Sequence, residues 1–260
     1  MNSPDLCIAN KAVGVEVRDF IINVPDTKEE SITDYLVWKW RTLDARFNYL
    51  NVKTFTRQEE NAKTGADFEL ELWLVGRSQC IPLLFQAKKF TRPFAGYVGK
   101  LNYPGNSQAQ LQKLLSYAAA QRLLPFYSIY THVAASRPLC GGRSDLDTGV
   151  YMIDAHEIKK VADGAQGRKV SLATLLRLSN PFHCMFCCPM SRDGSYFQNY
   201  FRSTAGKEVA RRPEELPAYA QRLLYSRDER GDKKSVDEAA LSEELPPVRV
   251  VGVYDVRDRE

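Results

Sequence analysis

The stretch that decides the fold is residues 64–91, TGADFELELWLVGRSQCIPLLFQAKKFT, in which two apolar runs flank a short polar segment. From Asp67 to Val75 apolar and polar residues alternate strictly, and this period of two predicts a β-strand. The run from Cys80 to Phe90 predicts the returning strand, with a turn at the polar segment between them. Its apolar core, IPLLF, predicts a sheet that is covered on both faces. One predicted face of the first strand carries Phe68, Leu70, Leu72 and Leu74, and the other carries Asp67, Glu69, Glu71 and Trp73.

The patterns on either side of this hairpin predict an α/β fold. Residues 26–47 keep apolar side chains at helical spacing, and Thr27 and Glu30 match a capping box at the start of this helix. The order helix, strand, strand, strand, helix, strand in the middle of the chain predicts a mixed sheet with helices on its faces. Further helices are predicted at 106–124, 155–162, 171–178 and 213–225, and further strands at 51–57, 125–134, 149–154 and 247–256, with an irregular loop at 92–105.

The composition is that of a globular protein with one large core, since 44% of the 260 residues are hydrophobic and 26% are charged. One domain with additions is expected rather than two full domains. No apolar run approaches the roughly 20 residues that span a bilayer, and the chain does not begin with a secretory signal. We expect a soluble, cytoplasmic protein without membrane contact, whose six cysteines are thiols or metal ligands.

The charges are distributed unevenly along the chain. The net charge is +4, yet residues 72–144 contain no Asp or Glu and nine Lys or Arg residues. A long segment of one sign predicts a surface that meets a polyanion such as nucleic acid. The alternative is that these bases pair with acids from other segments, such as Glu59 and Glu60.

Three polar residues of the predicted hairpin are expected to meet at one edge of the sheet. Gln86 and Lys88 are two residues apart and share a face, whereas Ala87 and Lys89 point to the other. If the strands pair across their predicted turn, Asp67 lies near Gln86 and Lys88. Carboxylate and carboxamide oxygens are ligands that Mg²⁺ accepts, and a lysine could hold a water and stabilise charge on a phosphate. The alternative is a structural ion pair between Asp67 and Lys88.

Asp67 followed by Gln86-Ala87-Lys88 resembles the motif of the PD-(D/E)XK nuclease superfamily, which has the restriction-endonuclease-like fold. Within it, the motif is similar to that of Mrr-type restriction enzymes, where Gln replaces the usual acidic residue. The resemblance covers roughly residues 28–135. It implies a nuclease that depends on Mg²⁺ or Mn²⁺, with Asp67, Gln86 and Lys88 in the catalytic site and Asp67 and Gln86 as metal ligands.

In this superfamily the first helix often contributes an acidic metal ligand, and Glu30 is the residue that matches best, with Asp34 second. The alternative is that Glu30 only caps the helix. The neutral Gln86 departs from the usual pattern. It implies weaker metal binding than in an all-carboxylate site, unless Glu30 or Glu60 contributes.

The resemblance implies hydrolysis of nucleic acid, DNA ahead of RNA, in prokaryotic restriction or anti-phage defence. A second copy of the chain or a regulatory protein partner is expected to control cutting. Aromatic and basic residues interleave after the hairpin, and nucleic-acid contacts are expected from Lys89, Arg92, Lys100 and Lys113. The alternative function is a catalytically inactive protein of this fold that binds nucleic acid or a protein partner.

The chain divides into four predicted segments. These are an N-terminal segment, 1–27; the nuclease-like core, 28–135; an extension of the core, 136–225; and a charged arm with a docking strand, 226–260.

Residues 181–189, PFHCMFCCP, contain His183, Cys184, Cys187 and Cys188 at spacings that resemble half of a zinc site. The remaining cysteines and histidines do not supply a second pair at such spacing. Because the segment is also rich in apolar residues, we predict a core strand here. A zinc-stabilised adaptor is the third functional alternative.

Overall fold

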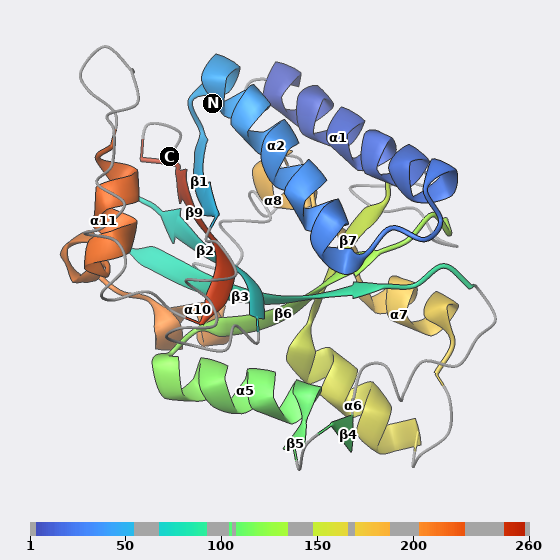
Figure 1. The fold of residues 1–260 in the computed structure, drawn as a ribbon. Coiled ribbons are helices and arrows are strands. Elements are labelled where there is room, and N and C mark those ends of the chain that lie inside the picture. Colours follow the sequence, from blue (N-terminus) through green and yellow to red (C-terminus); the bar gives the residue numbers. More distant parts are fainter. Residues whose placement is uncertain are drawn as a thin grey trace.

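A seven-stranded mixed β-sheet lies at the centre of the computed structural model, with helices on both of its faces (Figure 1). The structure describes residues 4–54, 68–92, 104–105, 108–134, 148–165, 170–187, 203–226 and 247–257. Within these ranges the α/β fold expected from the sequence is confirmed.

The strands are β1 (Leu50–Thr54), β2 (Phe68–Val75), β3 (Cys80–Lys89), β4 (Pro104–Gly105), β5 (Gln108–Ala109), β6 (Leu124–Tyr130), β7 (Val150–Asp154), β8 (Asn180–Pro181) and β9 (Val248–Asp255). The helices are α1 (Pro4–Asn23), α2 (Glu29–Phe47), α5 (Gln110–Gln121), α6 (Ala155–Ala165), α7 (Leu172–Leu178), α8 (Cys184–Cys187), α10 (Thr204–Val209) and α11 (Ala218–Leu224), with a short 3-10 turn η1 (Pro213–Glu215).

The predicted hairpin is formed by β2 and β3. The two strands pair antiparallel from Leu70 opposite Phe85 to Val75 opposite Cys80, and the Gly76 amide donates to the Gln79 carbonyl in the turn. Helix α5 then carries the chain across the sheet, so that β6 pairs with β3 in parallel. The helix–strand–strand–strand–helix–strand order expected from the sequence is therefore present.

The late strand β9 lies inside the sheet, whose strand order is β1-β9-β2-β3-β6-β7-β8. It pairs antiparallel with β1 and parallel with β2. The sheet thus draws a strand from the 226–260 segment into the middle of the 28–135 segment. Local pattern identifies this strand, but it carries no information on which neighbours the strand takes.

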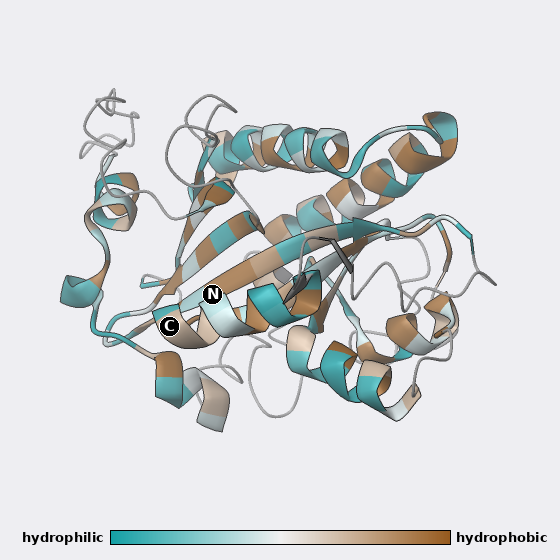
Figure 2. Ribbon diagram, turned by 60° about the horizontal axis from the view of Figure 1, so that its bottom comes forward, coloured by the Kyte–Doolittle hydropathy of each residue, from teal (hydrophilic) through white to brown (hydrophobic). Residues whose placement is uncertain are grey.

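Apolar side chains fill both faces of the sheet, as the IPLLF run predicts. One core cluster joins α1, α2 and α8 to the sheet through residues such as Trp40 and Phe85. The other joins α5, α6, α7 and α11 through residues such as Trp73 and Leu114. In Figure 2 the strands between these layers are largely hydrophobic, whereas the helices carry hydrophilic residues around part of their circumference.

Helix α1 covers much of the N-terminal segment 1–27, where no helix is expected from the sequence. Its buried Leu6, Val13, Val17 and Ile21 recur at helical spacing, and the acidic residues between these positions lie on the rest of its circumference. A Cβ added at Gly149 would lie 2.4 Å from the Arg18 nitrogen of α1, so a glycine permits this close approach.

Three local predictions are corrected by the structure. The capping box of Thr27 and Glu30 is absent, because the N-cap of α2 is Lys28 and no side chain caps it. The helix predicted at 213–225 is divided into η1 and α11. The division falls at Pro217, because proline has no main-chain N–H to donate a helical hydrogen bond to the preceding turn. The core strand predicted around Cys184 is the helical turn α8, in which Cys184, Met185 and Phe186 are nonetheless buried.

Cysteine chemistry at this turn also differs from the expectation of thiols or metal ligands. Cys184 is disulfide-bonded, whereas Cys80 is a buried thiol. Burial raises the pKa of the Cys80 thiol to about 11, so this group stays protonated at neutral pH.

Strict alternation along β2 holds from Leu70 to Val75 but fails at the two residues before it. Leu70 packs in the cluster beneath α2, whereas Phe68 packs with Trp73 on the opposite face. Glu69 bonds to Arg249, which also reaches α2, so Glu69 lies on the α2 side next to Leu70. A buried carboxylate needs a partner, and Arg249 supplies one on this side.

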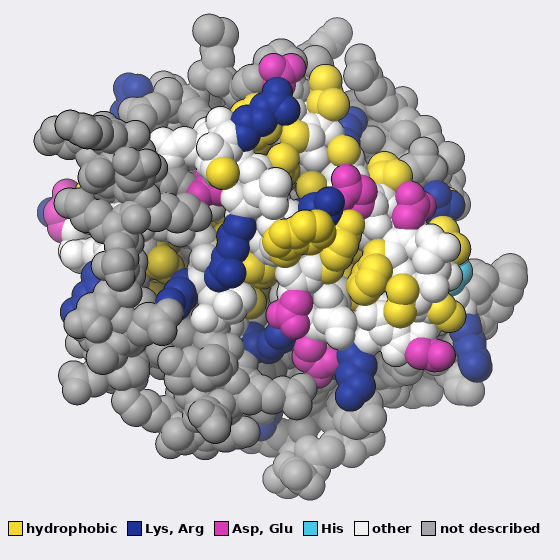
Figure 3. Space-filling model, turned by 45° about the horizontal axis from the view of Figure 1, so that its top comes forward, with side chains coloured by type: hydrophobic (Ala, Val, Ile, Leu, Met, Phe, Trp, Pro, Cys, Tyr) yellow, Lys and Arg dark blue, Asp and Glu magenta, His cyan; other side chains and the backbone are white. Residues whose placement is uncertain are grey.

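The outer surface of α1 and α2 carries exposed Ile8, Ile22 and Trp38. Figure 3 shows hydrophobic side chains interspersed with charged ones over this face. None of the described helices is both long and apolar enough to cross a membrane.

Candidate functional site

The end of β3 meets the first turn of α2 through Glu29. One carboxylate oxygen, Oε1, accepts the main-chain N–H of Lys89 at 2.9 Å. The other, Oε2, lies 3.6 Å from Lys88 Nζ. Because the Lys88 side chain is only 12% exposed, this contact is partly shielded from water. The α2 acid that touches the predicted catalytic lysine is therefore Glu29, one residue before Glu30.

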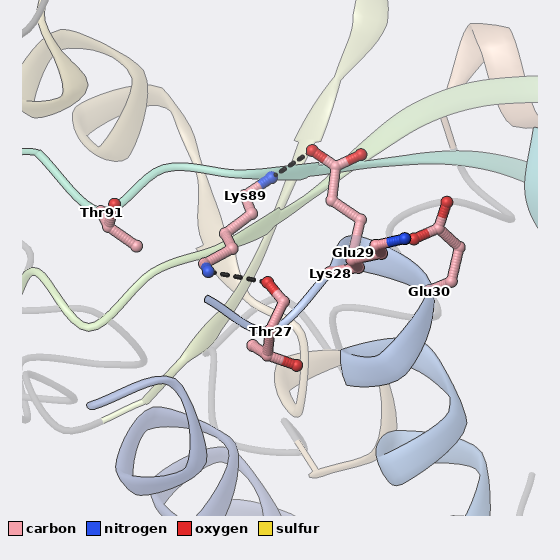
Figure 4. A pocket seen from close by; sticks show the side chains of 6 residues that line it. All are labelled: Thr27, Lys28, Glu29, Glu30, Lys89 and Thr91. Atoms are coloured by element: carbon pink, nitrogen blue, oxygen red, sulfur yellow. Dashed lines mark hydrogen bonds between the residues drawn. The ribbon is translucent and has the colours of Figure 1, made fainter. Parts of the chain in front are cut away.

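Lys89 fastens the connection between α1 and α2 to the same strand end. Its ammonium donates to the Pro25 carbonyl at 2.5 Å and to the Thr27 carbonyl at 2.8 Å. Figure 4 shows both the main-chain bond to Glu29 and the side-chain bond to Thr27. The sequence predicts that Lys89 contacts nucleic acid, but its ammonium is engaged by main-chain carbonyls of the protein.

A polar pocket of about 360 Å³ opens at this junction. It is lined by Thr27, Lys28, Glu29, Glu30, Lys89 and Thr91 (Figure 4). The pocket brings Glu30 to the same cavity as the end of β3. It also combines acidic and basic groups, which suits a ligand that carries charge of both kinds or a cation bridging to an anion.

Arg249 of β9 connects α2 to the sheet beside this pocket. Parallel pairing of β9 with β2 places it next to Glu69, and its Nη1 donates to Glu69 Oε1 at 2.8 Å. The same nitrogen donates to the main-chain oxygen of Glu30 at 3.2 Å, and Nη2 donates to Asp34 Oδ1 at 2.5 Å. One guanidinium therefore compensates two acids that come from different elements.

The Glu69 carboxyl is held in a dry environment, since its side chain is 11% exposed. Burial raises the pKa of Glu69, and the charge of Arg249 together with hydrogen bonding from Thr33 and Arg249 opposes that rise. The charge of Glu30 raises the pKa of Glu69 further.

The side chain of Gln86 is buried near the end of β3. Its Nε2 donates to the Ala87 carbonyl at 3.4 Å, but no donor among the described residues reaches its Oε1. The residue is 7% exposed. Such an atom in a native interior calls for an explanation, and a bound ion or water is one that fits.

The other predicted site residues are distributed as follows. Asp67, Lys100 and the alternative ligand Glu60 lie outside the described residues. Arg92 is exposed just beyond β3, on the same strand end as Lys88. Lys113 is exposed on α5, which covers the opposite face of the sheet from α2. The structure therefore brings Lys88, Lys89 and Glu30 together and keeps Lys113 apart.

The basic residues of the 72–144 segment are also spread over several contacts. Arg77 donates to the Arg257 carbonyl and Arg122 to the Glu208 carbonyl. Lys88 pairs with Glu29, so some bases of this segment do pair with acceptors elsewhere in the fold.

A second buried acid, Glu71, lies on the face opposite α2. Its Oε1 accepts from Trp73 Nε1 at 2.6 Å and from the Tyr219 hydroxyl at 2.5 Å. Burial raises the pKa of Glu71, while these two donors oppose the rise. The two bonds fasten α11 to β2, so Glu71 is a structural acid rather than a member of the pocket.

In the part of the chain that the structure describes, no group of three or more His, Cys, Asp or Glu residues is arranged to hold a metal ion. This includes the described portion of the segment around Cys184. A metal at the strand end would therefore need the Gln86 oxygen, or residues beyond the described ranges, in addition to a helix acid.

Sequence reasoning missed Glu29, Glu69 and Arg249 as members of the site. No sequence signal distinguishes Glu29, because the capping pattern favours its neighbour Glu30. Arg249 has a usable signal, since a single base within the valine-rich run PVRVVGV needs an acidic partner when that strand is buried.

Fold and site together define a mixed α/β protein with a charged pocket where the first turn of α2 meets the end of a central strand. The chain belongs to the family DUF6615, described as a family of unknown function, which it matches over residues 6–253. No curated protein and no solved structure matches it significantly.

Proposed function

We propose that the protein is a metal-dependent nuclease that hydrolyses phosphodiester bonds in nucleic acid, DNA ahead of RNA. The observation that carries the proposal is the junction of β3 with α2. There a shielded lysine, Lys88, lies against a helix acid and two residues after Gln86, whose Oε1 has no donor among the described residues. The superfamily resemblance of Asp67, Gln86 and Lys88 supports it.

The residues at this junction are compatible with Mg²⁺ or Mn²⁺. Gln86 Oε1, to which no described residue donates, is a ligand type that these ions take. Asp67, Gln86 and Glu30 would hold the ion, which when bound would polarise a phosphoryl oxygen and lower the pKa of a bound water. Because Gln86 is neutral, the affinity should depend on the carboxylate that Glu30 contributes.

The protein's own groups have distinct roles in this proposal. Lys88 binds the scissile phosphate or the attacking water and stabilises the negative charge that develops on the phosphate. Glu29 orients the Lys88 ammonium through their 3.6 Å contact. Arg92 near the strand end and Lys113 on the opposite face are proposed to contact the nucleic-acid backbone, together with Lys100, which lies outside the described residues.

A second candidate is a protein of this fold that binds nucleic acid or a protein partner without cleaving. It is favoured by the ion pairs already present, because Arg249 engages Glu69 and Asp34 while Lys88 engages Glu29. Acids that are committed to internal cations are less available to a metal.

A role in prokaryotic restriction or anti-phage defence is part of the first proposal and rests on the resemblance to Mrr-type enzymes. In that setting, a second copy of the chain or a regulatory partner would control cutting.

A cleavage assay tests the proposal. The purified full chain is incubated with supercoiled DNA, single-stranded DNA and RNA, each with Mg²⁺, Mn²⁺ or a chelator, alongside Asp67→Ala and Lys88→Ala. Metal-dependent cutting that both substitutions abolish supports the nuclease. Salt-sensitive binding that survives both substitutions, with no cutting by the parent, supports the binder instead.

A further inference from the structure

The first turn of α2 depends on tertiary contacts for its position. Its N-cap, Lys28, makes no side-chain capping bond, so the helix start lacks the local support that a Ser, Thr or Asp would give. The turn is held instead by the Glu29 carboxylate on the Lys89 amide and by Arg249 on the Glu30 carbonyl. Both anchors come from strands of the sheet.

We propose that Arg249 is a positioning residue, which holds the first turn of α2 so that Glu30 faces the metal at the end of β3. This inference rests on the proposed nuclease function. Arg249 does not reach the metal itself. It acts through the main chain of Glu30, and the same guanidinium is braced by Glu69 on β2 and Asp34 one turn further along α2.

Arginine is suited to this role by its shape. A planar guanidinium presents its donors in fixed directions. Its bonds to three acceptors on α2 and β2 therefore fix the position of the guanidinium and of the two elements relative to each other. Its side chain is 17% exposed, which limits competition from water. An ammonium at the same position would keep the charge, but it could not span the acceptors with the same geometry.

Removing Arg249 alone would mix two effects. The substitution leaves the buried Glu69 without its cation, which destabilises the fold and makes the site more negative. The double substitution Arg249→Met/Glu69→Gln removes one positive and one negative charge together. It therefore keeps the net charge of the site and isolates the effect on position.

The experiment measures Mn²⁺ binding by titration calorimetry and amide hydrogen exchange in residues 28–36, using the full chain. Four proteins are compared: the parent, Arg249→Met/Glu69→Gln, Glu69→Gln alone, and Arg257→Met. Arg257 is the matched control, since it forms a 2.7 Å ion pair with Asp255 at the other end of β9. Arg249→Lys is added as the conservative variant.

The double variant is expected to bind Mn²⁺ about 10-fold more weakly, as is common when a group that supports a metal ligand is lost. Its first-turn amides should exchange faster, whereas Arg257→Met should match the parent in both measurements. Arg249→Lys should fall between them.

Unchanged Mn²⁺ affinity in the folded double variant overturns the positioning role even if exchange is faster, because Arg249 would then only stabilise the helix. A parent protein that binds no Mn²⁺ and cuts no nucleic acid overturns the proposed function, and the positioning role with it. Measurements on the parent protein therefore show whether the nuclease function fails or only the positioning role of Arg249.

Discussion

Lys88 Nζ and Glu29 Oε2 lie 3.6 Å apart, and this contact joins the end of a central strand to the first turn of a helix. The pair brings together groups that are far apart in sequence, at the rim of the polar pocket. The Lys88 side chain is the more deeply buried of the two, at 12% exposed against 32% for Glu29. The first prediction concerns this lysine.

Lys88→Met is expected to reduce the cleavage rate by about 10²–10³-fold, since a positioned cation that stabilises developing charge is lost. The folded state should change in stability by no more than about 1 kcal/mol, because Glu29 is partly exposed and keeps its bond to the Lys89 amide. Rates are measured on a DNA substrate and stability by thermal unfolding. Lys39→Met, which removes a surface ion pair with Glu16, is the matched control and should cut at the parent rate. Equal rates for the two variants would contradict the role of Lys88.

Gln86 should respond in opposite ways to two substitutions. Gln86→Leu removes a buried acceptor that has no donor in the described part of the chain, so stability without metal should stay level or rise by about 1 kcal/mol while Mn²⁺ binding weakens. Gln86→Glu adds a carboxylate and should tighten Mn²⁺ binding, at a cost in metal-free stability. Calorimetric titration and thermal unfolding with and without Mn²⁺ check both. If neither variant changes Mn²⁺ binding, Gln86 is not a ligand.

Glu71 should make the protein less stable as pH rises. Burial raises its pKa above the ordinary value of 4.5, so the folded protein keeps a proton that the unfolded chain has released. Its contribution is therefore fully present below about pH 4.5 and is lost as pH rises through the folded pKa. Glu71→Gln keeps an acceptor for Trp73 and Tyr219 without the charge, and the fall of the melting temperature above pH 4.5 should become shallower. Parallel melting curves for parent and variant across this range would rule out the assignment.

Gly149→Ala should separate α1 from the start of β7. The added Cβ would lie 2.4 Å from the Arg18 nitrogen and 2.7 Å from its Cα, and the Gly149 amide donates to the Gly14 carbonyl at 2.7 Å. We expect a loss of about 1–3 kcal/mol in unfolding free energy, measured with denaturant. Gly164→Ala in α6 is the control, because no atom lies within 4 Å of the Cβ that it would add and alanine favours the helix by up to about 1 kcal/mol. A neutral Gly149→Ala would mean that α1 can shift without cost.

Much of the local structure could be predicted because it depends on short-range pattern. The alternation in 70–75, the apolar IPLLF run and the turn between them suffice for the β2–β3 hairpin, whose register then follows. The helical spacing of apolar residues in α2 can also be recognised from the sequence. The first residue of α2 cannot, because Thr27 and Glu30 match a capping box that the folded chain does not form.

The candidate site was predictable only in part, because some of its features depend on local sequence and others on tertiary packing. Sequence alone determined that Gln86 and Lys88 stand at the end of a buried strand, because strand periodicity and the cost of burying polar groups are properties of a few consecutive residues. Only the tertiary structure decided that β9 enters between β1 and β2, and that Arg249 meets Glu69 across 180 residues of chain. Such pairings result from packing and charge compensation over the whole fold, which no local pattern contains.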